Sequence, residues 1–171
     1  DVEGDPDDVG EWGELMQWPL VGIHVALMPD GEVLAYDSVG DRRTEFYTEP
    51  QVRTRALLWD PEKEADDSIS TFAAETGVNL FCSGLAHLAD GTLFVAGGNK
   101  NAALDGSGFT SIFDGETFTR TADMAYERWY PTVTPLANGE MLITEGVAKQ
   151  ASTESVPAEV RGLDGSIRTL S

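Results

Sequence analysis

The sequence contains few basic residues. Lysine and arginine together number 11 against 30 aspartates and glutamates, only three of the basic residues are lysines, and the formal net charge is −19. A field this negative repels nucleic-acid phosphates and anionic lipid headgroups, so we expect neither nucleic acid nor a membrane surface as a partner. A solvated acidic surface, a salt-rich habitat and a lysine-poor genome explain the charge equally well, and the charge does not identify a substrate.

Long apolar runs are also missing. No run approaches the roughly 18 residues that a membrane-spanning helix needs. Residues 1–13 are acidic and show no basic stretch followed by an apolar one, so they are not an unprocessed signal peptide. We expect residues 1–12 to form a flexible acidic lead-in, and the protein to be secreted or extracellular with its signal peptide not in the chain.

Cysteine is almost absent. The single one, Cys82, excludes an intrachain disulfide, and a lone cysteine is either inert and buried or chemically used. The sequence shows no Ser-His-Asp arrangement, no phosphate-binding loop and no zinc-type cysteine cluster that would support another enzyme class.

The most informative feature that is present is a hairpin pattern that recurs three times. Each copy is an apolar run, an Asp-Gly or Asn-Gly turn and a second apolar run, the strongest short-range signal for a tight β-hairpin. The copies occupy residues 27–36, 88–97 and 136–145, and their turn glycines are Gly31, Gly91 and Gly139, spaced by 60 and 48 residues. A further strand that ends in an aspartate turn follows each hairpin, at residues 57–61, 111–115 and 160–165.

Units of three or four antiparallel strands are the content of a propeller blade. We therefore predict an all-β fold, a kelch-like β-propeller with about three antiparallel blades at residues 20–75, 78–125 and 128–171, within a partial propeller at 13–171. A β-sandwich with chance hairpins is the alternative. No convincing helical period appears, apart from a short turn near residues 123–128. Propellers typically have four to eight blades, so we expect an incomplete ring, with the remaining blades on the same or another chain.

The repeat also aligns two reactive side chains. Cys82 and Tyr130 each lie nine residues before their turn glycines, Gly91 and Gly139. The first strand of each blade lines the central channel, so equivalent positions in neighbouring blades are adjacent, and we expect this thiol and phenol to meet near the axis. Gly22 holds the equivalent position in the first unit.

Several segments resemble one family. Residues 79–84 with 95–98, and the Arg-Trp-Tyr-Pro-Thr run within 125–132, resemble two successive blades of the galactose oxidase/glyoxal oxidase family of copper-radical oxidases. Trp12 with residues 23–27 and 29–31 is similar to the first blade of that family. The resemblance covers about residues 10–146. The third unit departs from the family at residues 144–146, Thr-Glu-Gly in place of paired glycines.

The resemblance implies a cofactor. In that family a thioether joins the cysteine to the tyrosine, and the modified tyrosine is a copper ligand and a tyrosyl radical; here these residues are Cys82 and Tyr130. Sulfur on the ring eases one-electron oxidation, and copper provides the second one-electron step of a two-electron oxidation. The chain would then be part of an oxidase that converts primary alcohols or aldehydes, carbohydrates among them, with O2 to H2O2. We expect Trp129 to shield this cofactor or to serve in packing.

Other interpretations stay open. Cys82 could be a small core residue and Tyr130 a core aromatic, in a non-catalytic kelch-like propeller that binds a protein or a glycan. A degenerate relative could keep both residues without the later copper ligands. His24 and His87 lie seven and four residues before their turn glycines, in different registers, and we predict structural roles for both. In the family the two histidine ligands and an axial tyrosine come from later blades. Substrate choice would rest on loops 37–52 and 99–108.

Overall fold

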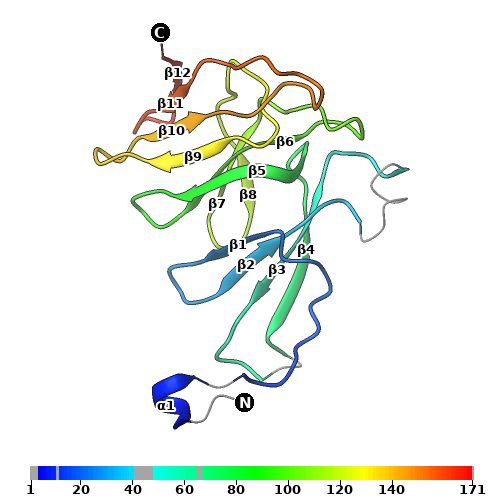
Figure 1. The fold of residues 1–171 in the computed structure, drawn as a ribbon, viewed down its shortest axis with the longest axis vertical. Coiled ribbons are helices and arrows are strands. Elements are labelled where there is room, and N and C mark those ends of the chain that lie inside the picture. The colour runs from blue at the N-terminus through cyan, green and yellow to red at the C-terminus, as the bar shows by residue number, and fades with distance from the viewer. Residues whose placement is uncertain (1–3, 11, 41–47, 65–66, 171) are drawn as a thin grey trace.

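The structure is a computed structural model that describes residues 4–10, 12–40, 48–64 and 67–170. The described residues form three four-stranded antiparallel sheets, which confirms the predicted all-β fold of three blades (Figure 1). Each sheet follows chain order. The first holds β1 (His24–Leu27), β2 (Val33–Tyr36), β3 (Thr54–Trp59) and β4 (Ile69–Ala74); the second holds β5 (Asn79–His87), β6 (Leu93–Asn99), β7 (Thr110–Phe113) and β8 (Phe118–Arg120); the third holds β9 (Thr132–Pro135), β10 (Met141–Thr144), β11 (Glu159–Arg161) and β12 (Ile167–Thr169).

The three predicted hairpins share one turn geometry. In the first, the Gly31 amide donates to the Met28 carbonyl at 3.0 Å, and the Asp30 side chain accepts from the Glu32 amide at 3.1 Å. Gly31, Gly91 and Gly139 have φ values of 92°, 88° and 85°, a conformation that glycine adopts without steric cost. The Asp-Gly and Asn-Gly pairs therefore fix where each first strand turns back.

The structure differs from the sequence-based expectation of helix in two places, residues 6–9 and residues 123–128. A four-residue helix, α1 (Pro6–Val9), begins after Asp5, whose side chain accepts the Asp7 amide. The stretch considered as a helical turn, residues 123–128, is instead irregular, because the Met124 amide donates to the Gly108 carbonyl and the Ala125 amide to the Glu159 carboxylate. Among the described residues no helix is long and apolar enough to cross a membrane.

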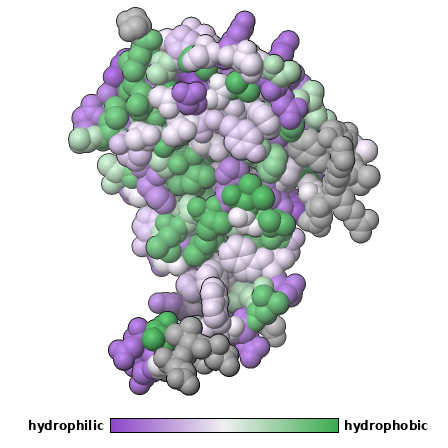
Figure 2. All heavy atoms as spheres, in the orientation of Figure 1, coloured by the Kyte–Doolittle hydropathy of each residue, from purple (hydrophilic) through white to green (hydrophobic). Residues whose placement is uncertain are grey.

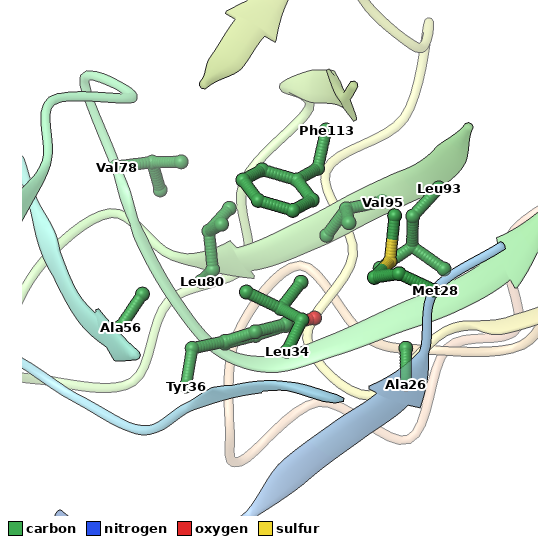
Figure 3. Close-up of a cluster of buried hydrophobic side chains, with 10 residues drawn as sticks. All are labelled: Ala26, Met28, Leu34, Tyr36, Ala56, Val78, Leu80, Leu93, Val95 and Phe113. Atoms are coloured by element: carbon green, nitrogen blue, oxygen red, sulfur yellow. The ribbon is translucent and has the colours of Figure 1, made fainter. Parts of the chain in front are cut away.

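The blades pack face to face through β6, which is buried along its whole length. Successive side chains of a strand point to opposite faces, so Leu93 and Val95 join the core shared with the first blade while Phe94 and Ala96 join the core shared with the third. Figure 3 shows the first of these cores, where Tyr36 and Leu34 of β2 lie opposite Leu80, Val95 and Phe113. The second blade is thus the central layer.

The first blade keeps one apolar row uncovered. Ile23, directly before β1, and Val25 and Leu27 within it are all exposed, although their spacing is that of a core face. Figure 2 shows hydrophobic side chains gathered over the part of this face where Figure 1 places β1 and β2.

Candidate functional site

Cys82 lies in a bulge of β5. The pairing of β5 with β6 passes from Asn79↔Asn99 to Ser83↔Gly97, so residues 80–82 have no partners of their own in the ladder. Within this bulge Cys82 has a φ of 63°, which is uncommon for a residue other than glycine. Bulges re-aim side chains, and this one turns the Cys82 thiol out of the regular alternation of the strand.

Tyr130 has the matching conformation in the next blade. Its φ is 61°, and it stands two residues before β9 begins. Its amide donates to the Cys82 carbonyl at 2.9 Å. The two residues that share a register position therefore also share a left-handed backbone and a direct main-chain hydrogen bond between the second and third blades.

The two side chains interact, although their exposure differs. Cys82 is 1% exposed and Tyr130 is 58% exposed. Burial raises the pKa of the Cys82 thiol, and the nearby Tyr130 hydroxyl and Trp129 indole oppose that rise. The contact with the thiol, followed by burial, raises the pKa of the Tyr130 hydroxyl to about 12. Near neutral pH the pair is therefore a neutral thiol beside a neutral phenol.

Trp129 covers one edge of this pair. Its ring centroid lies 4.5 Å from that of Tyr130 at an interplanar angle of 63°, an edge-on contact. Its backbone is fixed by a bridge to Val147, with hydrogen bonds of 2.8 and 3.0 Å. The indole is therefore held beside both Tyr130 and the sulfur of Cys82.

The turn that carries Tyr130 is anchored by a buried ion pair that sequence reasoning missed. Arg128 and Glu159 are both 0% exposed and meet at 2.9 Å. The Arg128 guanidinium also donates to the carbonyls of Glu145, at 2.6 Å, and of Pro157. The second Glu159 oxygen accepts the Ala125 amide at 2.6 Å. The only sequence signal was an arginine inside the aromatic run Arg-Trp-Tyr, because Glu159 lies 31 residues further on.

The two histidines have different surroundings. The Nε2 atom of His24 accepts the Cys82 amide at 3.1 Å, so His24 borders the site from the first blade. Burial lowers the pKa of His24 to about 4, which keeps its ring neutral near pH 7. His87 instead contacts the Gly91 carbonyl of its own hairpin. The contact between His24 and Cys82 could not be predicted from the repeat, because the two residues lie at different distances from their turn glycines. The bulge in β5 is what brings the Cys82 amide to the His24 ring.

Within the described parts of the chain, no three or more His, Cys, Asp or Glu side chains group in a way that could hold a metal ion. The donor beside Cys82 that suits copper is the Tyr130 phenol oxygen, a single ligand. Of the two predicted substrate loops, 99–108 is described, whereas residues 41–47 of loop 37–52 lie outside the described residues.

We compared the chain with known proteins. No family model matches the chain. Two galactose oxidases of Gibberella zeae are each 26% identical to it over 143 residues, which is 81% of this chain and 19% of their own length. A solved structure, a fungal alcohol oxidase of the AA5 family in complex with copper, is 25% identical with a TM-score of 0.74, and the match covers 94% of this chain and 32% of that one.

The chain thus spans about a fifth of the length of the curated relatives that it matches. The structural match covers 94% of the chain and therefore includes all three sheets. These likenesses show that the chain is similar to the galactose oxidase/glyoxal oxidase-like family of copper oxidases.

Proposed function

We propose that this chain is part of a copper-radical oxidase that oxidises primary alcohols or aldehydes with O2, giving H2O2, through a Cys82–Tyr130 thioether. The observation that carries the proposal is the meeting of these two residues across the second and third blades. Their backbones are joined at 2.9 Å and their side chains interact. A structural role for Tyr130 does not require the Cys82 thiol beside it, whereas a thioether cofactor requires the two groups to be in contact.

The cross-link is a balanced oxidation. The Cys82 sulfur bonds to a ring carbon of Tyr130 beside the hydroxyl, and the S–H and that C–H are lost. The two electrons and two protons reduce O2 to H2O2. Burial protects the sulfur from other oxidants, and the exposed face of Tyr130 leaves its hydroxyl open to a metal and a substrate. In the turnover reaction an alcohol becomes an aldehyde with the same reduction of O2.

Tyr130 fits copper as one ligand, since a phenolate oxygen suits the tetragonal N,O sites of Cu(II). Bound Cu(II) would accept the second of the two electrons that the substrate loses. The imidazole ligands would come from further blades. Trp129 would limit the access of water to the modified ring, because its indole lies edge-on against Tyr130.

Further blades, on the same or another chain, would cover the exposed row of Ile23, Val25 and Leu27 at β1 and the residue before it. Full burial of such a side chain contributes about 1.5–3 kcal/mol, and because these three are 50%, 49% and 66% exposed, roughly half of that gain remains for each when further blades cover them. We place the protein outside the cell, with a small alcohol or aldehyde and O2 as its partners and with no nucleic-acid or membrane partner.

The protein that includes the further blades, which would supply the imidazole ligands, should release H2O2 when it is loaded with copper and supplied with O2 and a primary alcohol or aldehyde. Tyr130→Phe and Cys82→Ser should each lower that release by at least about 1000-fold, and the double variant should lose little more, because the two residues act as one unit. Removal of copper by a chelator should abolish the reaction. A peroxide assay over a panel of alcohols and aldehydes measures this, with His87→Asn as a control outside the site. Absence of release from the copper-loaded wild type would favour a non-catalytic propeller that binds a protein or a glycan. Unchanged release from Tyr130→Phe would show that the oxidation does not pass through Tyr130.

A further inference from the structure

Cys82 is held on both sides by neighbouring blades. Its carbonyl accepts the Tyr130 amide from the third blade at 2.9 Å. Its amide donates to the Nε2 atom of His24 in the first blade at 3.1 Å. A residue in a bulge has no ladder partner for its backbone, and a buried amide without an acceptor costs about 1–3 kcal/mol. The His24 ring therefore supplies the acceptor that the bulge itself does not.

The His24 ring is rigidly placed. It stacks on Tyr36 with ring centroids 4.6 Å apart and an interplanar angle of 17°. Tyr36 is fully buried in the core between the first two blades (Figure 3). Its hydroxyl is 3.1 Å from the Ser83 hydroxyl, next to Cys82 in sequence. His24 and Tyr36 thus form a support that contacts β5 at two successive residues.

The rest of the bulge is held by other groups. The Leu80 amide donates to the Thr54 hydroxyl at 2.7 Å, and the Phe81 amide donates to the Asn79 side chain at 3.0 Å. These contacts fix residues 79–81, and the contact from His24 alone fixes the Cys82 amide among the hydrogen bonds described. Since φ of Cys82 sets where its sulfur points, the His24 contact acts directly on the orientation of the thiol.

We infer that His24 is a positioning residue for the cofactor: it holds the Cys82 backbone so that the sulfur stays against the Tyr130 ring while the thioether forms. The inference rests on the proposed function. His24 does not touch the reacting atoms, and its effect passes through one hydrogen bond to the Cys82 amide. Loss of that bond lets the bulge relax and lowers the fraction of chains in which sulfur and ring are in contact.

The test compares His24→Gln with His24→Asn. Glutamine places a carbonyl oxygen the same number of bonds from Cβ as Nε2, whereas the asparagine oxygen is one bond closer to the backbone and does not reach the Cys82 amide. The readout is the rate at which the intact mass falls by two hydrogens after Cu(II) and O2 are added at pH 7. We expect His24→Asn and His24→Leu to react about tenfold more slowly, the factor for about 1.4 kcal/mol, and His24→Gln to stay near the wild-type rate.

His87→Asn serves as the matched control and should react at the wild-type rate, because His87 contacts only its own hairpin among the bonds described. Equal rates for His24→Gln and His24→Asn would overturn the inference while leaving the proposed function intact. Failure of the wild-type protein to lose two hydrogens when the further blades are present to complete the copper site would instead overturn the proposed function. Glutamine and asparagine both remove the ring that stacks on Tyr36. A difference in rate between these two variants therefore reports the hydrogen bond to the Cys82 amide and not a loss of stability.

Discussion

Replacing Arg128 with methionine should lower the free energy of unfolding by about 3–5 kcal/mol, because it leaves the Glu159 carboxylate buried without its cation. Both side chains are 0% exposed, so water cannot compensate for the lost partner. The substitution also removes the donors to the carbonyls of Glu145 and Pro157. Urea-induced unfolding of the two proteins measures the difference.

Arg168→Met is the matched control. Arg168 forms a two-pronged pair with Glu140 at 2.7 and 2.9 Å, but its side chain is 53% exposed. Exposed pairs of this kind are worth about 0.2–1 kcal/mol. A loss for Arg128→Met no larger than that for Arg168→Met would contradict the role of the buried pair as the anchor of the turn that carries Tyr130.

Replacing Gly97 with alanine should cost at least about 3 kcal/mol, from two sources that add. Gly97 has a φ of 78°, and an alanine in this conformation costs about 1–2 kcal/mol. A Cβ atom there would also lie 2.5 Å from the Arg128 carbonyl oxygen and 3.0 Å from the Pro131 ring. At these distances the backbone of residues 128–131 must shift, and this segment contains Tyr130. Thermal or urea unfolding gives the stability, and the rate of thioether formation should fall in parallel.

Gly31→Ala separates the two sources. Gly31 has a φ of 92°, but nothing lies within 4 Å of a Cβ built on it. Only the conformational cost applies there, about 1–2 kcal/mol. Equal losses for Gly31→Ala and Gly97→Ala would show that the second and third blades do not approach each other as closely at Gly97 as the structure has it.

The hairpins could be predicted from sequence because their causes are local. An Asp-Gly or Asn-Gly pair between two apolar runs supplies the positive φ of the turn and the side-chain acceptor for the amide two residues on, as at Asp30 and Gly31. Counting from such turns also aligns Cys82 with Tyr130. Such local rules are enough to predict the order of the strands, because neighbouring strands in each sheet are also consecutive in the sequence.

The parts that could not be predicted depend on contacts between blades. The left-handed backbone of Cys82 follows from a bulge held by Thr54 and His24 of the first blade, and no residue near Cys82 signals it. Likewise, Arg128 and Glu159 are charged residues that composition alone would place at the surface. They are buried because each satisfies the other, together with backbone groups of the Tyr130 turn and the nearby segments.

The site is thus assembled from all three blades: His24 from the first, Cys82 from the second, and Tyr130 with its buried anchor from the third. A change in the packing between blades, such as Gly97→Ala, should therefore slow thioether formation at Cys82 although the changed residue does not contact the thiol.

The central claim is that Cys82 and Tyr130 form a thioether, and the most direct measurement is the mass of the chain after incubation with Cu(II) and O2. We predict a loss of two hydrogens and, after proteolysis, one species that joins the Cys82 and Tyr130 peptides through a bond resistant to reducing agents. Cys82→Ser and Tyr130→Phe should each prevent it. An unchanged mass in the protein that includes the further blades, with Cys82 alkylated after denaturation, would contradict the claim.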